Sequence, residues 1–89
     1  MQYKATILDF QFSPMVDGIP SDLRIRVFIK TLNLETTLNT ESGSIESLSK
    51  KFDFEIVNEY EWDFKDFEGR KCIVEQDANG FRFISFVED

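Results

Sequence analysis

Histidine is absent from this chain of 89 residues, and cysteine occurs once, as Cys72. Without histidine, the chain lacks the commonest general base and the commonest transition-metal ligand in proteins. A single thiol excludes an intramolecular disulfide and a zinc-binding cysteine cluster, and it is typical of a reducing compartment. These absences predict a non-enzymatic protein with no catalytic residues, no metal site and no cofactor.

The sequence also lacks an apolar run of membrane-spanning length, and its start has neither the basic region nor the apolar core of a signal peptide. Acidic residues outnumber basic ones by 17 to 10, which gives a formal net charge of -7. This charge opposes nonspecific attraction to nucleic acid or anionic lipid, so a nucleic-acid site would require a local basic surface. We therefore expect a soluble, cytoplasmic protein with no membrane partner.

Aromatic residues are abundant, and ten of them are phenylalanine. Aromatic and β-branched residues favour strands. A chain of this length can bury one hydrophobic core but not two. The composition therefore predicts a single, mainly β domain over residues 1–89.

Five segments have the composition or two-residue alternation of strands, namely residues 3–12, 22–31, 34–40, 70–76 and 81–87. In the first segment, Leu8, Phe10 and Phe12 are expected to share one face. The second and third segments are separated by a tight turn and should pair as an antiparallel hairpin. Residues 13–21 contain both prolines and are expected to form a loop, and Asn79-Gly80 is typical of a turn.

One helix is predicted between the third and fourth strands. Ser44 is a suitable N-cap for residues 45–52, in which Ile45, Leu48 and Phe52 fall on one face. Residues 55–69 fit either an irregular strand or an ordered loop. The resulting order β-β-β-α-β-β matches the oligonucleotide/oligosaccharide-binding (OB) barrel, which has five strands and a helix after the third. An SH3-like barrel and an α+β meander are alternatives.

The second predicted strand has one apolar face and one cationic face. Arg24, Arg26, Phe28 and Lys30 alternate with apolar residues. Basic groups can follow a phosphate backbone, and an exposed ring between them can stack on a base. This face is the predicted site for single-stranded nucleic acid, with residues 13–21 and 77–80 as rims and with Lys71 and Arg82 as extensions. The alternative is a solvated strand face without a ligand.

The acidic and aromatic segment 55–68 is a second candidate surface. A partner protein would contact Glu59, Tyr60, Glu61, Trp62 and Asp63. Spaced carboxylates beside apolar anchors suit a docking surface for a basic protein, or an inhibitor of the anti-defence or DNA-mimic type. The alternative is a loop whose rings cover one end of the domain. Cys72 is expected to fill the core, and the oligomeric state stays open because an exposed edge strand can pair with a copy of itself.

Residues 62–86, WDFKDFEGRKCIVEQDANGFRFISF, resemble the closing part of small bacteriophage single-stranded-DNA-binding proteins of the OB type. The matching positions are Trp62, Gly69, Arg70, Cys72 and Val74. The resemblance implies an accessory protein of replication or recombination in a phage or other mobile element. The acidic character of the whole chain departs from that pattern and fits the protein-binding alternative better.

Overall fold

The computed structural model describes residues 1–14, 20–58 and 61–88. Its elements, in chain order, are β1 (Gln2–Ser13), β2 (Ser21–Ile29), the 3-10 turn η1 (Lys30–Leu32), β3 (Leu34–Thr37), β4 (Glu41–Gly43), α1 (Ile45–Phe52), β5 (Glu55–Asn58), β6 (Glu61–Asp63), β7 (Lys71–Asp77) and β8 (Gly80–Phe86). The expectation of a mainly β domain with one short helix is confirmed.

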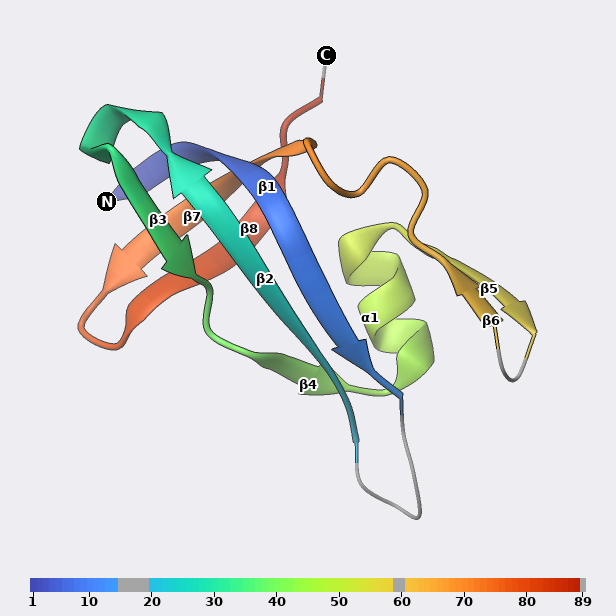
Figure 1. Ribbon diagram of the computed structural model, residues 1–89. Coiled ribbons are helices and arrows are strands. Elements are labelled where there is room, and N and C mark those ends of the chain that lie inside the picture. Colours follow the sequence, from blue (N-terminus) through green and yellow to red (C-terminus); the bar gives the residue numbers. More distant parts are fainter. Residues whose placement is uncertain (15–19, 59–60, 89) are drawn as a thin grey trace.

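The main sheet has six strands and is open (Figure 1). Its order is β3-β2-β1-β7-β8, all antiparallel neighbours, and β4 pairs with the start of β2. The predicted pairing of the second and third strands is confirmed. Among the described residues, one backbone hydrogen bond connects the segment after β3 with β8, from the Asn39 amide to the Phe81 carbonyl at 2.8 Å. The two ends of the sheet therefore approach each other without forming a ladder.

β1 is shared between two neighbours. Residues 2–6 pair with β7 and residues 6–13 pair with β2. The register with β2 shifts between Ile7 and Asp9, so Leu8 is the extra residue of a β-bulge. Before the bulge Ile7 is buried, and after it Phe10 packs against the core. The prediction that Leu8, Phe10 and Phe12 share one face is therefore wrong for Leu8, because the bulge resets the alternation.

The predicted helix is confirmed at both of its ends. Ser44 is the N-cap and its hydroxyl accepts a hydrogen bond from the Ser47 amide at 3.1 Å. Leu48 and Phe52 are buried, which places the apolar face of the helix on the core. Asp53, in the left-handed conformation with φ 54°, ends the helix. The cap and the apolar period in the sequence thus predicted the bounds of this helix, and packing of its apolar face on the core stabilises it.

The undecided segment 55–69 contains a short hairpin followed by a loop. β5 and β6 pair with each other only, in a two-stranded sheet that projects from the body of the molecule (Figure 1). Phe64 and Phe67 follow the hairpin and pack against Phe10, at ring-centroid distances of 4.5 and 4.9 Å. These rings fill the space beside the second half of β1, where that strand has no β7 neighbour.

Several predicted boundaries move by a few residues. The second strand ends at Ile29 instead of residue 31, because Lys30 begins the 3-10 turn, and β3 ends at Thr37 instead of residue 40. Ser13 and Ser21 belong to strands, so the predicted loop 13–21 is too long at both ends. Residues 15–19 of that loop lie outside the described residues. Strand β4 was not predicted.

Candidate nucleic-acid interface

β2 has the two faces that its alternation predicts. Leu23, Ile25, Val27 and Ile29 are all 2% exposed or less. The opposite face carries Arg24, Arg26 and Phe28, and all three side chains have solvent access. Phe28 is only partly exposed, so its ring lies on the outer face in contact with its neighbours. Antiparallel pairing sets those neighbours: Thr6 of β1 on one side and Glu35 of β3 on the other.

A hollow of about 240 Å³ surrounds the Phe28 ring. Its lining residues are Lys4, Thr6, Phe28, Lys30, Thr31 and Lys71. Thr6 pairs with both Phe28 and Lys71, so the three side chains form one row across β2, β1 and β7. The Lys71 ammonium also donates a hydrogen bond to the Thr6 hydroxyl at 3.4 Å. We call these six residues the Phe28 pocket.

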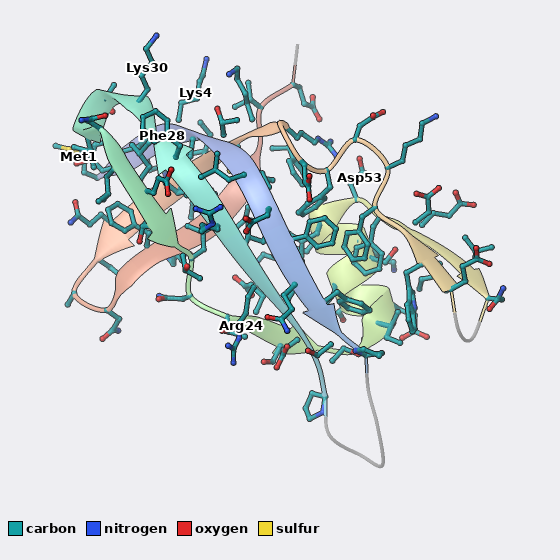
Figure 2. The ribbon with its side chains drawn as sticks, viewed as in Figure 1. Met1, Lys4, Arg24, Phe28, Lys30 and Asp53 are labelled. Carbon is teal, nitrogen blue, oxygen red and sulfur yellow. The ribbon has the colours of Figure 1, made fainter. Side chains whose placement is uncertain are left out.

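Three lysines lie around this ring, and no carboxylate is among the lining residues. Lys4, Lys30 and Lys71 make no ion pair with any carboxylate in the described part of the chain. Figure 2 shows Lys4, Phe28 and Lys30 at the same end of the sheet. The pocket therefore combines positive charge with an aromatic surface in a protein whose net charge is -7.

The two arginines of the predicted site precede Phe28 in β2 and lie closer to the start of that strand. Arg24 is close to the opposite end of the strand (Figure 2) and lines a different hollow, together with Asp9 and Arg26. It makes no ion pair within the described residues. The structure thus brings Phe28 and Lys30 together in one pocket and leaves Arg24 apart from them.

Arg26 is held by two carboxylates. Its guanidinium contacts Asp9 of β1 at 2.6 Å and Glu35 of β3 at 2.8 Å. The hydrogen bond from Arg26 lowers the pKa of Asp9 below its usual value, and the same bond raises the pKa of Arg26. Because the positive charge already has two partners, Arg26 is less available to a phosphate than a lysine of the pocket.

The described ends of the predicted rim 13–21 and the turn 77–80 lie away from the Phe28 pocket, and residues 15–19 lie outside the described residues. Phe28 lies seven positions along β2 from Ser21, roughly 23 Å at the usual rise of a strand. The turn at 77–80 follows the end of β7 that is opposite to Lys71. Arg82, one of the two predicted extensions, pairs with Glu75 and Asp77 on the last hairpin. Lys71, the other extension, does join the pocket.

Lys4 and Lys71 were not part of the primary predicted site. Sequence carries a signal for Lys4, because it lies two positions from Thr6 and therefore on the same face of β1. No local pattern reveals that this face continues the face of β2. That relation depends on which residues of β1, β2 and β7 are paired.

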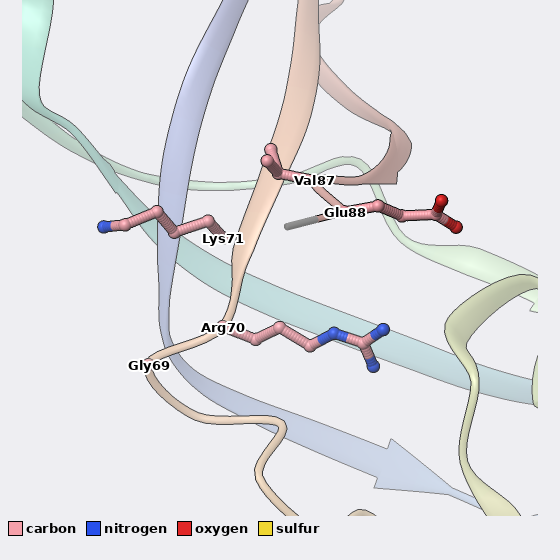
Figure 3. A pocket seen from close by; sticks show the side chains of 5 residues that line it. All are labelled: Gly69, Arg70, Lys71, Val87 and Glu88. Carbon is pink, nitrogen blue, oxygen red and sulfur yellow. The ribbon is translucent and has the colours of Figure 1, made fainter.

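A larger hollow, of about 630 Å³, lies at the start of β7 and is lined by Gly69, Arg70, Lys71, Val87 and Glu88 (Figure 3). Arg70 and Lys71 extend to opposite sides of the strand. The Arg70 guanidinium lies 3.6 Å from the centre of the Phe86 ring and forms an ion pair with Asp53 at 3.1 Å. This arginine is already partnered, and Glu88 adds a negative charge, so this hollow is a weaker anion site than the Phe28 pocket.

The second predicted surface is only partly described. Glu59 and Tyr60 lie outside the described residues, while Glu61, Trp62 and Asp63 form β6. Trp62 packs edge-on against Phe12 at a centroid distance of 5.2 Å. Glu61 and Asp63 are exposed. The aromatic residue therefore anchors the hairpin, and the acids on either side of it face solvent.

The described residues contain no group of three acidic, cysteine or histidine side chains that would hold a metal ion. None of the described helices is long and apolar enough to cross a membrane. Comparison with known proteins finds no matching family model, no matching curated protein and no matching solved structure.

Proposed function

We propose that this protein is a non-catalytic module that binds single-stranded nucleic acid at the Phe28 pocket. The observation that carries the proposal is the partly exposed Phe28 ring, which lies among three lysines that have no carboxylate partner in the described structure. A ring of this kind can stack on any base, and lysines around it can neutralise the phosphates on either side. Lys4, Lys30 and Lys71 are the proposed phosphate contacts.

The strand order supports assignment to the OB-like barrels, which are partly open and bind oligonucleotides on an outer face. The central β1 contacts both halves of the sheet, the helix follows β3 and the short β4, and the Asn39–Phe81 hydrogen bond connects the two sheet ends. In the usual arrangement the ligand lies on the second and third strands. Here the proposed path leaves β2 in the other direction, across β1 and β7, because the unpaired lysines are there.

The biological setting is proposed from the resemblance at residues 62–86. A replication or recombination accessory in a phage or other mobile element, working in the cytoplasm, needs affinity for exposed single strands without strong sequence preference. A pocket that offers one ring and three ammonium groups provides this kind of contact, since stacking tolerates every base.

The test is a titration of a labelled single-stranded oligonucleotide at several salt concentrations, followed by fluorescence anisotropy. With three phosphate contacts, the logarithm of the binding constant should fall with the logarithm of salt concentration at a slope of about -2. Phe28→Ala should cost about 1 to 3 kcal/mol of binding free energy, because it removes the stacking surface. Lys71→Gln should weaken binding and make the slope shallower by about 0.7.

Two variants serve as controls. Lys50→Gln removes the same charge from an exposed position of α1 and should leave both affinity and slope almost unchanged. Arg26→Gln should also have a small effect, because the arginine is already paired with Asp9 and Glu35. The proposal fails if the oligonucleotide does not bind at low salt, or if Lys50→Gln weakens binding as much as Lys71→Gln does.

A further inference from the structure

Another hollow lies between the first turn of α1 and the projecting β5–β6 hairpin. It has a volume of about 380 Å³, and its lining residues are Ile45, Glu46, Ile56, Asn58 and Trp62. Ile56 and Trp62 are directly paired across the hairpin, so they present a joint surface toward the helix. We call this hollow the hairpin groove.

The hairpin exposes two large apolar side chains to solvent. Ile56 is 38% exposed and Val57 is 50% exposed, and both are among the large apolar residues with the greatest solvent contact. β5 and β6 pair only with each other, so neither residue is covered by the main sheet. Exposed apolar residues on a projecting element, next to a groove, are typical of a protein-binding surface.

Two carboxylates border this apolar surface. Glu46 lines the groove from the helix, and Glu61 accepts a hydrogen bond at 3.2 Å from Asn58, which also lines the groove. Glu55 and Asp63 pair with each other next to the groove-facing pair of the hairpin, so strand alternation places them on its other face. None of these four forms an ion pair within the described residues. The sequence contains no lysine or arginine from residue 52 to residue 64. The chemistry of the rim therefore favours a cationic occupant.

Trp62 supplies a further indication. Its indole Nε1–H is buried and has no hydrogen-bond acceptor among the described residues. A buried tryptophan usually donates this proton to an oxygen. A peptide that binds in the groove would bring backbone carbonyl groups close to the ring, and a small adjustment of the hairpin would let one of them accept the bond.

We propose that the hairpin groove is a docking site for a cationic segment of another protein. The segment inserts an apolar side chain between Ile45 and Ile56, and its lysines or arginines contact Glu46 and Glu61. A nucleic acid is disfavoured here because its phosphates would meet these carboxylates. A second copy of this chain is disfavoured because each copy carries a net charge of -7. The groove and the Phe28 pocket share no residue, so this inference does not rest on the proposed function.

The experiment begins with a library of random dodecapeptides displayed on phage and selected on the full chain. The expected result is enrichment of peptides that combine several lysines or arginines with at least one large apolar residue. Synthetic peptides from this selection are then titrated into the protein. Ile56→Ser should weaken their binding at least about tenfold, and the double change Glu46→Lys, Glu61→Lys should weaken it several-fold.

Matched controls lie elsewhere on the surface. Leu32→Ser changes an apolar residue that is 41% exposed on η1, and Glu68→Lys reverses an exposed charge outside the groove. Neither should alter peptide affinity by more than about twofold. Enrichment of peptides without basic residues, or equal losses in the controls and the groove variants, would overturn the proposal.

The location is tested by the only tryptophan of the chain. Its indole resonance in a ¹H–¹⁵N spectrum reports on the groove alone, and it should shift when a selected peptide is added. A single-stranded oligonucleotide should leave this resonance unchanged, whether or not it binds at Phe28. If the oligonucleotide shifts it, or if dilution of the free protein shifts it, the occupant is a nucleic acid or a second copy and the proposal is wrong.

Discussion

Cys72 lies in β7 and is completely buried, which confirms the expectation that it fills the core. Its burial has a chemical consequence, because a thiolate is poorly stabilised away from water. Burial raises the pKa of the thiol from 9.0 to about 11. The native fold therefore protects this side chain from reactions that require the thiolate.

This shift predicts a loss of stability in alkaline solution. The folded protein disfavours the thiolate, so the contribution of Cys72 is fully present below the unfolded pKa of about 9 and is lost as the pH rises toward about 11. The loss in unfolding free energy should reach about 2 to 3 kcal/mol. Urea titrations from pH 8 to 11 measure it. A Cys72→Ala variant, which has no thiol, should show a shallower decline, and an identical decline would contradict the prediction.

Positive side chains that look equivalent in the sequence differ in their partners. Arg26 in β2 and Lys30 at the start of η1 fall in one alternating series in the sequence, yet Arg26 contacts Asp9 and Glu35 while Lys30 has no described carboxylate partner. The difference arises because each residue meets different strands that are distant in sequence, namely β1 and β3 beside Arg26 and β1 and β7 beside Lys30. Arg26 therefore joins β2 to β1 and β3 through ion pairs, whereas Lys30 makes no ion pair within the described residues.

At the scale of elements, the bulge in β1 determines which aromatic residues reach the core. Ala5 and Ile7 are buried in the first half of the strand, whereas Phe10 and Phe12 pack inward in the second half. Odd-numbered residues face the core before Leu8, and even-numbered residues do so after it. This change of phase is a sequence signal for a bulge, although Leu8, Phe10 and Phe12 conceal it because they look like one unbroken alternating series.

The bulge predicts opposite outcomes for two single-residue deletions in β1. Deletion of Leu8 removes the extra residue and keeps Ile7, Phe10 and Phe12 on the core side. Deletion of Gln11 instead turns Phe12 away from its contacts with Phe54, Phe64 and Trp62. Loss of a fully buried phenylalanine costs about 3 to 5 kcal/mol, and the partly buried Phe12 falls at the lower end of this range. Chemical denaturation should therefore find the variant without Gln11 less stable by about 3 kcal/mol, and equal stabilities would argue against this account of the strand.

At the scale of the whole molecule, the two ends of the open main sheet lie close to each other. β3 and β8 are the outer strands in the pairing order. The Asn39–Phe81 hydrogen bond joins the segment that follows β3 to β8. Gly80 is next to this contact, where an added Cβ would meet the Asn39 side-chain oxygen at 3.3 Å. Its φ of 118° is also unfavourable for other residues. A glycine at this position therefore permits the close approach.

Hydrogen exchange tests whether this contact holds the sheet ends together. The amide of Asn39 should exchange slowly, within about tenfold of the Leu38 amide, which donates to Ile25 inside the sheet. The Asn79 amide, which donates only to the Asp77 side chain in an exposed turn, provides the comparison for a weakly protected position. Exchange of Asn39 as fast as that of Asn79 would mean that the sheet ends separate readily in solution.

The sequence alone determined the elements whose signals are local. The alternation of β2, the cap and apolar face of α1, and the long strands on either side of them follow from side-chain periods of two and about 3.6 residues. Segment 55–69 stayed undecided because its aromatic residues pack against the distant β1. The same applies to β4, which three residues form only because β2 is there to pair with them.

Tertiary structure decided how the candidate sites are composed. Lys4 and Lys71 join Phe28 because Thr6 pairs with β2 on one side and with β7 on the other. The pairing of β2 with β1 and β3 also brings Asp9 and Glu35 to Arg26, which lies outside the pocket. An alternating pattern specifies that a side chain faces outward, but the charge beside it depends on a register between strands that lie up to 65 residues apart.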